Sequence, residues 1–220
     1  MYKIYINDLP IKLVQSTTAN AGLGDYNILE FQYESNADLL SIINYAEHFP
    51  HAKEIVVWSQ EIEALKKDFF NNFMYLEAGG GVVFNKNNEM LLIYRNDKWD
   101  LPKGKIKKAE SNQEGALREV IEETGVENLS VISPVKIDGT EQTCTYHNYA
   151  YNMHRILKAT HWFIMHTDYT GELAPQTDEG IEKAEWVPID EVLGRLKNSY
   201  KTIIDVASAA ILGHKSLNAV

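Results

Sequence analysis

The stretch GKIKKAESNQEGALREVIEETGV, from Gly104 to Val126, decides what fold and chemistry the rest of the chain is expected to have. Ser111 or Asn112 can cap the first turn of a helix, and Gly125 suits the position that ends one. The residues between them therefore predict a short helix with defined ends.

Apolar and acidic side chains fall on opposite sides of this predicted helix, which turns by about 100° per residue. The apolar set is Leu117, Val120, Ile121 and Thr124, and the acidic set is Glu119, Glu122 and Glu123. We expect Leu117, Val120 and Ile121 to anchor the helix on a core, with the acidic set on the other side. A solvated face is the ordinary explanation for such acids, so the wider pattern must decide between the two interpretations.

The wider pattern is specific. It reads Gly104, five residues, Glu110, seven residues, Arg118-Glu119-Val120, one residue, Glu122-Glu123, one residue and Gly125-Val126. This arrangement resembles the Nudix box, the signature of hydrolases that act on nucleoside diphosphates linked to another group. The resemblance extends over residues 79–196. It implies an α/β (α+β) fold, namely a Nudix-type α/β/α sandwich with a mixed sheet.

The resemblance also implies a divalent cation, Mg²⁺ or Mn²⁺, bound by the acidic set. Hard cations prefer carboxylate, carbonyl and water oxygens, which agrees with this interpretation. In related enzymes the loop that opens the box adds a backbone carbonyl, and Lys103 holds the matching position. Four further box residues are expected to have structural roles: Gly104, Glu110, Arg118 and Gly125. Arg118 would orient the acids, and Glu110 would brace the loop and the helix.

The general base is open between two regions. Related enzymes take it from the box, where Glu119 or Glu122 could serve, or from a later loop. Asp178 and Glu179 lie in such a loop, just before a short predicted strand. Glu179 is our choice, and an exposed loop acid is the alternative.

A group of cations precedes the acidic helix in a chain whose formal net charge is -10. Such cations can neutralise the phosphates of a substrate, although lysines of this kind can also be merely solvent-exposed. The candidates for substrate binding are Arg95, Lys98, Lys103 and Lys105.

The segments KWDLPKGK and THWFIM resemble the branch of the family that cleaves dinucleoside polyphosphates such as diadenosine tetraphosphate. The diphosphoinositol polyphosphate hydrolases and the nucleoside triphosphate pyrophosphohydrolases are alternatives within the family. A nucleotide-sensing regulator that binds without cleaving is an alternative of another class. Three tyrosines could stack on a purine or pack along a strand; they are Tyr146, Tyr149 and Tyr151.

The histidines do not have the compact spacing of a metal site, and two of them would point to opposite faces of one strand. We therefore expect surface or core positions for them, with His161 near the phosphates as an option. These residues are His147, His154, His161 and His166.

The composition limits the partners and the compartment. The net charge of -10 argues against broad nucleic-acid binding, and no apolar run is long enough for a membrane helix. Cys144 is the single cysteine, which is typical of a reducing compartment. We expect a soluble, cytoplasmic protein with a small nucleotide as substrate, and a homodimer is an option.

The chain is expected to form two domains, a small α+β domain of unknown role at 1–76 and the Nudix domain at 77–220. The glycines at 79–81 are expected to mark a break before a new strand. Predicted strands are 1–8, 10–16, 27–33, 54–59, 81–85, 90–96, 129–138, 143–152, 159–167 and 184–188. Predicted helices, besides the acidic one, are 36–49, 60–75, 189–197 and 202–212.

Overall fold

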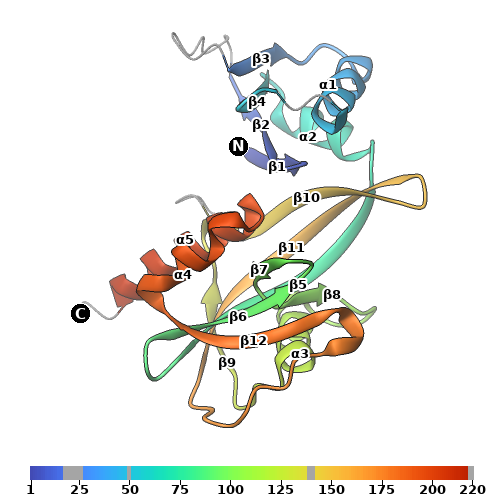
Figure 1. Cartoon of the computed structure of the whole chain (residues 1–220). Coiled ribbons are helices and arrows are strands. Elements are labelled where there is room, and N and C mark those ends of the chain that lie inside the picture. The colour runs from blue at the N-terminus through green and yellow to red at the C-terminus, as the bar shows by residue number, and fades with distance from the viewer. Residues whose placement is uncertain (17–26, 49–50, 138–141, 218–220) are drawn as a thin grey trace. The chain divides into compact units, whose positions relative to one another are not determined.

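The computed structural model describes residues 1–16, 27–48, 51–137 and 142–217 (Figure 1). The chain divides into two compact units. The first holds Met1–Leu76 and Tyr146–Lys158, and the second holds Glu77–Thr145 and Ala159–Val220. No described helix is long and apolar enough to cross a membrane.

The first unit is a mixed sheet with two helices. Its strands run in the order β10-β1-β2-β4-β3, where β1 and β2 are antiparallel while β4 is parallel to both β2 and β3. Its elements are β1 (Tyr2–Ile6), β2 (Leu9–Gln15), β3 (Ile28–Gln32), α1 (Asn36–His48), β4 (Glu54–Ser59), α2 (Ile62–Phe70) and part of β10 (Cys144–Tyr151).

The helices of the first unit share one hydrophobic cluster with the sheet. Alternate strand residues such as Ile4 and Ile11 point into it, and Leu39 and Phe69 enter it from α1 and α2. All four side chains are 0% exposed. Burying apolar side chains of this size stabilises the unit by about 1.5–3 kcal/mol for each one.

The second unit contains the Nudix-like pattern. Its sheet has the order β12-β6-β5-β11, with β7 on β6, β8 on β5 and β9 on β11. Its strands are β5 (Met74–Asn85), β6 (Glu89–Arg95), β7 (Lys98–Asp100), β8 (Lys103–Lys105), β9 (Ser130–Pro134), β11 (His154–Thr167) and β12 (Ile181–Pro188). Its helices are α3 (Asn112–Thr124), α4 (Ile189–Arg195) and α5 (Lys201–Leu217).

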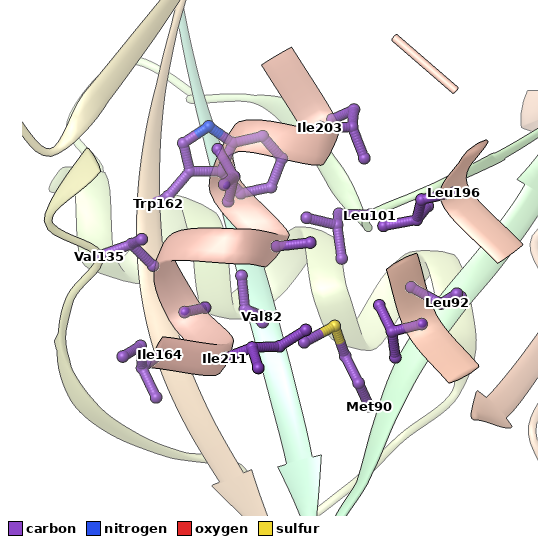
Figure 2. Packing of buried hydrophobic residues seen from close by; sticks show 14 of the residues in the cluster. Val82, Met90, Leu92, Leu101, Val135, Trp162, Ile164, Leu196, Ile203 and Ile211 are labelled. Carbon is purple, nitrogen blue, oxygen red and sulfur yellow. The ribbon is translucent and has the colours of Figure 1, made fainter. Parts of the chain in front are cut away.

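Helices cover both faces of this sheet, which makes it an α/β/α sandwich. Val82 and Ile164 belong to the cluster under α4 and α5, which Figure 2 shows together with Trp162. Their chain neighbours Val83 and Met165 belong to the cluster under α3. The sequence prediction of a sheet with helices on both faces is thus confirmed, because successive strand residues face opposite sides.

The predicted break at the three glycines is wrong. Gly79, Gly80 and Gly81 lie inside β5, which continues from Met74 to Asn85. A Cβ atom on Gly79 would lie 2.6 Å from the backbone nitrogen of Ala116 in α3, and one on Gly81 would lie 2.6 Å from Val120 Cγ2. Gly79 and Gly81 are there because α3 packs directly on the strand backbone, whereas a Cβ atom on Gly80 would lie 2.5 Å from Trp162 Cζ3.

Other differences concern the ends of elements. The second helix ends at Phe70 and not near residue 75, because β5 already begins at Met74. The division between the two units falls inside β5, and the hairpin Tyr146–Lys158 joins the first unit, which the sequence does not signal. The strand expected at 129–138 ends at Pro134, and position 138 lies outside the described residues.

Replacing Gly79 by alanine should destabilise the protein, because its Cβ would meet backbone atoms of α3 that cannot move independently. We expect the free energy of unfolding, measured with urea, to fall by about 1–3 kcal/mol. Gly194→Ala is the matched control, since a Cβ in α4 meets nothing within 4 Å there. Equal stability of the two variants would contradict this account of β5.

Candidate active site

The acidic helix α3 has well-defined ends. Ser111 is the N-cap: its side chain accepts a hydrogen bond from the backbone of Glu114, and the Glu114 carboxylate accepts one from the backbone of Ser111. Gly125 ends the helix in the left-handed conformation, with φ of 69°. This reciprocal cap satisfies two donors of the first turn and fixes where the acidic residues begin.

The expectation that Leu117, Val120 and Ile121 all anchor α3 on the core is wrong in part, and the alternative of a fully solvated acidic face is wrong as well. Glu119 is 6% exposed and Glu123 is 0% exposed, whereas Ile121 is 41% exposed. Val120 does anchor the helix on the sheet. The two glutamates are buried because they lie beneath the loop that carries Gly104, where a Cβ atom would come within 2.0 Å of Glu119 Oε2.

The guanidinium group of Arg118 donates hydrogen bonds to three glutamates of the box. Arg118 Nη1 donates to Glu119 Oε1 at 2.6 Å and to Glu122 Oε2 at 2.8 Å. Its Nε and Nη2 donate to the two oxygens of Glu110 at 2.6 and 2.8 Å, and Nη2 also reaches the carbonyl of Lys105 at 2.9 Å. Arg118 therefore ties the helix, two of its acids and the preceding loop together.

Glu110 closes the loop on its own side. Its Oε2 also accepts from the backbone nitrogen of Lys107 at 2.8 Å. The hydrogen bond from Arg118 is the main reason why the pKa of Glu110 falls to about 2, with the bond from Lys107 adding to it. Glu110 thus remains ionised and holds the loop at neutral pH.

A second charged group lies at the other end of the acidic set. Glu123 Oε2 accepts from the backbone nitrogen of Lys103 at 2.8 Å, and Glu123 Oε1 pairs with Arg95 Nη1 at 3.2 Å. Asp100, only 2% exposed, accepts from Arg95 Nε at 3.2 Å and from Lys103 Nζ at 2.6 Å. Two acids and two cations from β6, β7, β8 and α3 are therefore packed together.

Burial sets the protonation of this group. It raises the pKa of Glu123 to about 7, although Arg95 and Lys103 act in the opposite direction. Burial also opposes the charge of Asp100, but Lys103 and Arg95 outweigh it and lower the pKa of Asp100. In the metal-free protein Asp100 is thus the firmly ionised partner of the two cations.

The later loop reaches the same region. Backbone nitrogens of Ala174 and Gln176 donate to the carbonyls of Thr124 and Glu123 at 2.8 and 3.1 Å, which ties the loop to the end of α3. Glu179 is exposed in the short 3-10 turn that follows. Burial lowers the pKa of Arg95, but the charges of Asp100 and Glu123 outweigh burial and raise it. The charge of Glu179 adds a smaller effect in the same direction.

The cations predicted to bind substrate are not equivalent. Arg95 and Lys103 pair with buried acids, and the ammonium of Lys98 lies 4.3 Å from the ring centre of Tyr200. Lys105 is exposed beside the box. Lys107, which the sequence analysis did not select, lies 3.5 Å from Glu122 and is also exposed.

The remaining sequence candidates make other contacts. Tyr146, Tyr149 and Tyr151 belong to the first unit, and Tyr146 packs against Phe70 there with ring centres 5.0 Å apart. His161 is next to Glu77 at 3.7 Å, and burial lowers its pKa. Within the described part of the chain, no three histidine, cysteine or acidic side chains converge tightly enough to hold a metal ion together.

Two of the expected ligands nevertheless suit a hard divalent cation. Glu119 and Glu122 place one oxygen each on the same nitrogen of Arg118, so these two carboxylates already lie close together. Mg²⁺ is often held by one or two carboxylates together with waters and substrate phosphates. Glu123 could bind the metal ion together with Glu119 and Glu122 only after its ion pair with Arg95 is broken.

An α/β/α sandwich with this acidic helix and its glycine loop defines the class of protein. A family model described as the NUDIX domain matches residues 74–206, and the chain belongs to the Nudix family. A Bacillus subtilis protein provisionally named 8-oxo-dGTP diphosphatase is 43% identical over 54 residues, which is 24% of this chain and 36% of that protein. Nudix hydrolase 5 of Arabidopsis thaliana is 30% identical over 125 residues, or 53% of this chain and 37% of that protein.

These matches cover only about a third of the length of the first curated relatives, 36% for both of the first two. Among solved structures, a Caenorhabditis elegans Ap4A hydrolase complex is similar with a TM-score of 0.47 and 16% identity, covering 63% of this chain and 98% of that one. A MutT protein from Methanosarcina mazei has a TM-score of 0.44 and 20% identity, covering 62% and 94%.

Sequence reasoning missed Asp100 and Gln176. Asp100 stands between Trp99 and Leu101, and an acid with apolar neighbours close to several cations could have suggested a buried ion pair. Gln176 contributes its backbone, which no sequence pattern reveals, and its buried side-chain oxygen has no hydrogen-bond partner among the described residues.

The raised pKa of Glu123 predicts a pH-dependent stability in the metal-free protein. Its value is about 7 in the folded state against 4.5 for the ordinary side chain, so folding favours the neutral acid. The stabilising contribution is complete below pH 4.5 and is lost as the pH rises to about 7. Relative to Glu123→Gln, the parent should lose about 1–3 kcal/mol of unfolding free energy across this range.

Urea unfolding at several pH values in the presence of a chelator measures this difference. The variant loses a carboxylate at every pH, so the change of the difference with pH is the informative quantity. Parallel curves for parent and variant would contradict the burial of an ionisable Glu123.

Proposed function

We propose that this protein is a metal-dependent pyrophosphohydrolase that cleaves a phosphoanhydride bond in a nucleoside diphosphate-linked substrate. One observation carries the proposal: Glu119 and Glu122 present oxygens to a single nitrogen of Arg118, at 2.6 and 2.8 Å, beside the glycine loop of the box. Two carboxylates held this closely can both bind one Mg²⁺ or Mn²⁺ ion. Glu123 and the Lys103 carbonyl are the further ligands we propose.

The residues of the chain have separate roles in this proposal. A bound divalent cation would neutralise phosphate charge and make a bound water more acidic. Arg118 keeps two of the acids oriented, and Glu110 holds Arg118 in place. Lys105 and Lys107 attract the phosphates, because both are exposed beside the box, and Arg95, Lys98 and Lys103 are the further candidates for substrate binding.

We propose Glu179 as the general base. The exposed turn that carries it is tied to the end of α3, and its charge is felt at Arg95. Glu179 can therefore take a proton at the edge of the site while the acids of the box remain bound to metal. Glu119 and Glu122 are the alternatives within the box.

The substrate we propose is a dinucleoside polyphosphate such as diadenosine tetraphosphate. The support is the resemblance of KWDLPKGK, whose residues build β7, β8 and the loop over Glu119 and Glu123. A nucleoside triphosphate is the second candidate, supported by the Bacillus relative named for 8-oxo-dGTP. Diphosphoinositol polyphosphates are a third option, and a sensor that binds nucleotides without cleavage is the alternative of another class.

We also propose that residues 1–76 form a separate α+β domain and 77–220 the Nudix domain, with the hairpin Tyr146–Lys158 of the latter packed into the first unit. The family match begins at residue 74, close to the division inside β5. A role in dimerisation or in shaping substrate access is open for the N-terminal domain. A cytoplasmic location remains a prediction from the single cysteine.

Glu122→Gln should lower kcat by about 10²-fold or more with Mg²⁺, because a metal ligand is lost while an exposed side chain leaves the core unchanged. Glu123→Gln should act similarly, and Glu179→Gln should lower kcat as well, because it removes the proposed general base. Glu127→Gln, an exposed acid just beyond α3, is the control and should remain fully active. Activity of Glu122→Gln within about tenfold of the parent would count against the metal site.

A substrate panel tests the class of reaction. Purified protein with Mg²⁺ would be incubated with dinucleoside polyphosphates, nucleoside triphosphates including 8-oxo-dGTP, nucleotide sugars and inositol pyrophosphates. We expect the highest kcat/KM for diadenosine tetraphosphate, with release of mononucleotides. Tight binding of a nucleotide without any product would favour the sensor.

A further inference from the structure

Asp100 is the least exposed acid of the candidate site apart from Glu123, and it is not among the expected metal ligands. It ends β7 and is 2% exposed. Its Oδ1 accepts from the backbone nitrogen of Leu101 at 2.8 Å, while its Oδ2 accepts from Arg95 Nε at 3.2 Å and Lys103 Nζ at 2.6 Å. Asp100 therefore binds the charged groups of Arg95 and Lys103, two residues that also contact Glu123.

The four residues form a closed ring of contacts. From Asp100 the ring passes to Arg95, then from Arg95 Nη1 to Glu123 Oε1 at 3.2 Å. It returns from Glu123 Oε2 to the backbone nitrogen of Lys103 at 2.8 Å, and from the Lys103 ammonium to Asp100. The guanidinium of Arg95 is thus shared between Asp100 and Glu123, whereas Lys103 contacts Asp100 with its ammonium and Glu123 with its backbone nitrogen.

The charges of this ring determine how readily a cation can approach Glu123. Arg95 and Lys103 together carry two positive charges, and Asp100 removes one of them, which leaves a net charge of +1 beside Glu123. Without the charge of Asp100 the net value would be +2. Both cationic side chains are mostly buried, at 16% and 12% exposure, so solvent screens them poorly.

We propose that Asp100 is a positioning residue for Glu123: it retains Arg95 and Lys103 and offsets their charge, so that a divalent cation can compete for the Glu123 carboxylate. The inference rests on the proposed function, because it assumes that Glu123 takes part in metal binding. If Asp100 were neutral, Arg95 and Lys103 would have Glu123 as the one carboxylate of the ring, and Glu123 would be held away from the metal.

Mn²⁺ binding to the full-length, chelator-stripped protein tests this directly, without substrate and without turnover. Free Mn²⁺ would be followed by electron paramagnetic resonance at about pH 8.5, where carboxylates are ionised. Asp100→Asn should weaken the Mn²⁺ affinity by about tenfold, although the side chain keeps its shape and one oxygen acceptor. Asp97→Asn is the matched control: it removes the same charge from an exposed turn three residues away and should bind like the parent.

A double variant separates charge compensation from a purely structural role. Arg95→Met combined with D100N removes one cation and one anion, so the charge beside Glu123 returns to +1 and the affinity should recover most of the tenfold loss. A structural role would instead make the two changes add to one another. If D100N alone does not fold, D100N is measured in the Arg95→Met background, where it should again weaken binding.

The outcomes are distinct. Parent-like affinity of D100N, or a double variant that binds no better than D100N, would overturn the inference while leaving the metal site in place. Equal affinity of Arg95→Met with and without D100N would overturn it as well. A parent protein that takes up no Mn²⁺ at all would overturn the proposed function and this inference together.

Discussion

The burial of two carboxylates on one helix is the constraint on which the rest of this site depends. Glu119 and Glu123 are almost completely removed from solvent, and an ionised carboxylate is costly to bury unless it has strong donors. Arg118 supplies them for Glu119, while Arg95 and the backbone of Lys103 supply them for Glu123. The loop of β7 and β8 must therefore lie over α3 in one particular way.

Glycine makes this approach possible from two directions. On one side Gly79 and Gly81 let α3 lie directly on β5, and on the other Gly104 lets the loop close over Glu119. The helix is thus held between strand and loop with little room to shift. A helix held in this way keeps its acids at fixed positions, and the proposed metal site requires such precise positions.

The two faces of the sheet in the second unit carry different kinds of side chain. The cluster beneath α4 and α5 contains large aliphatic and aromatic side chains, including Met90 and Trp162 (Figure 2). The opposite face carries α3, the box and the loop with Glu179. The charged groups can therefore be arranged for binding, because the other face supplies most of the apolar burial.

The sequence by itself determined the family, the boundaries of α3, the sandwich and most of the strands and helices. The local reason is that caps, turn residues and the alternation of apolar side chains act within a few residues of one another. Tertiary structure decided which glutamates are buried, that the three glycines lie inside a strand, and that Asp100 joins Arg95, Lys103 and Glu123. These features depend on contacts between residues far apart in the chain. Helical periodicity places Glu119 on the side opposite the apolar set, but it does not show that a loop covers that side.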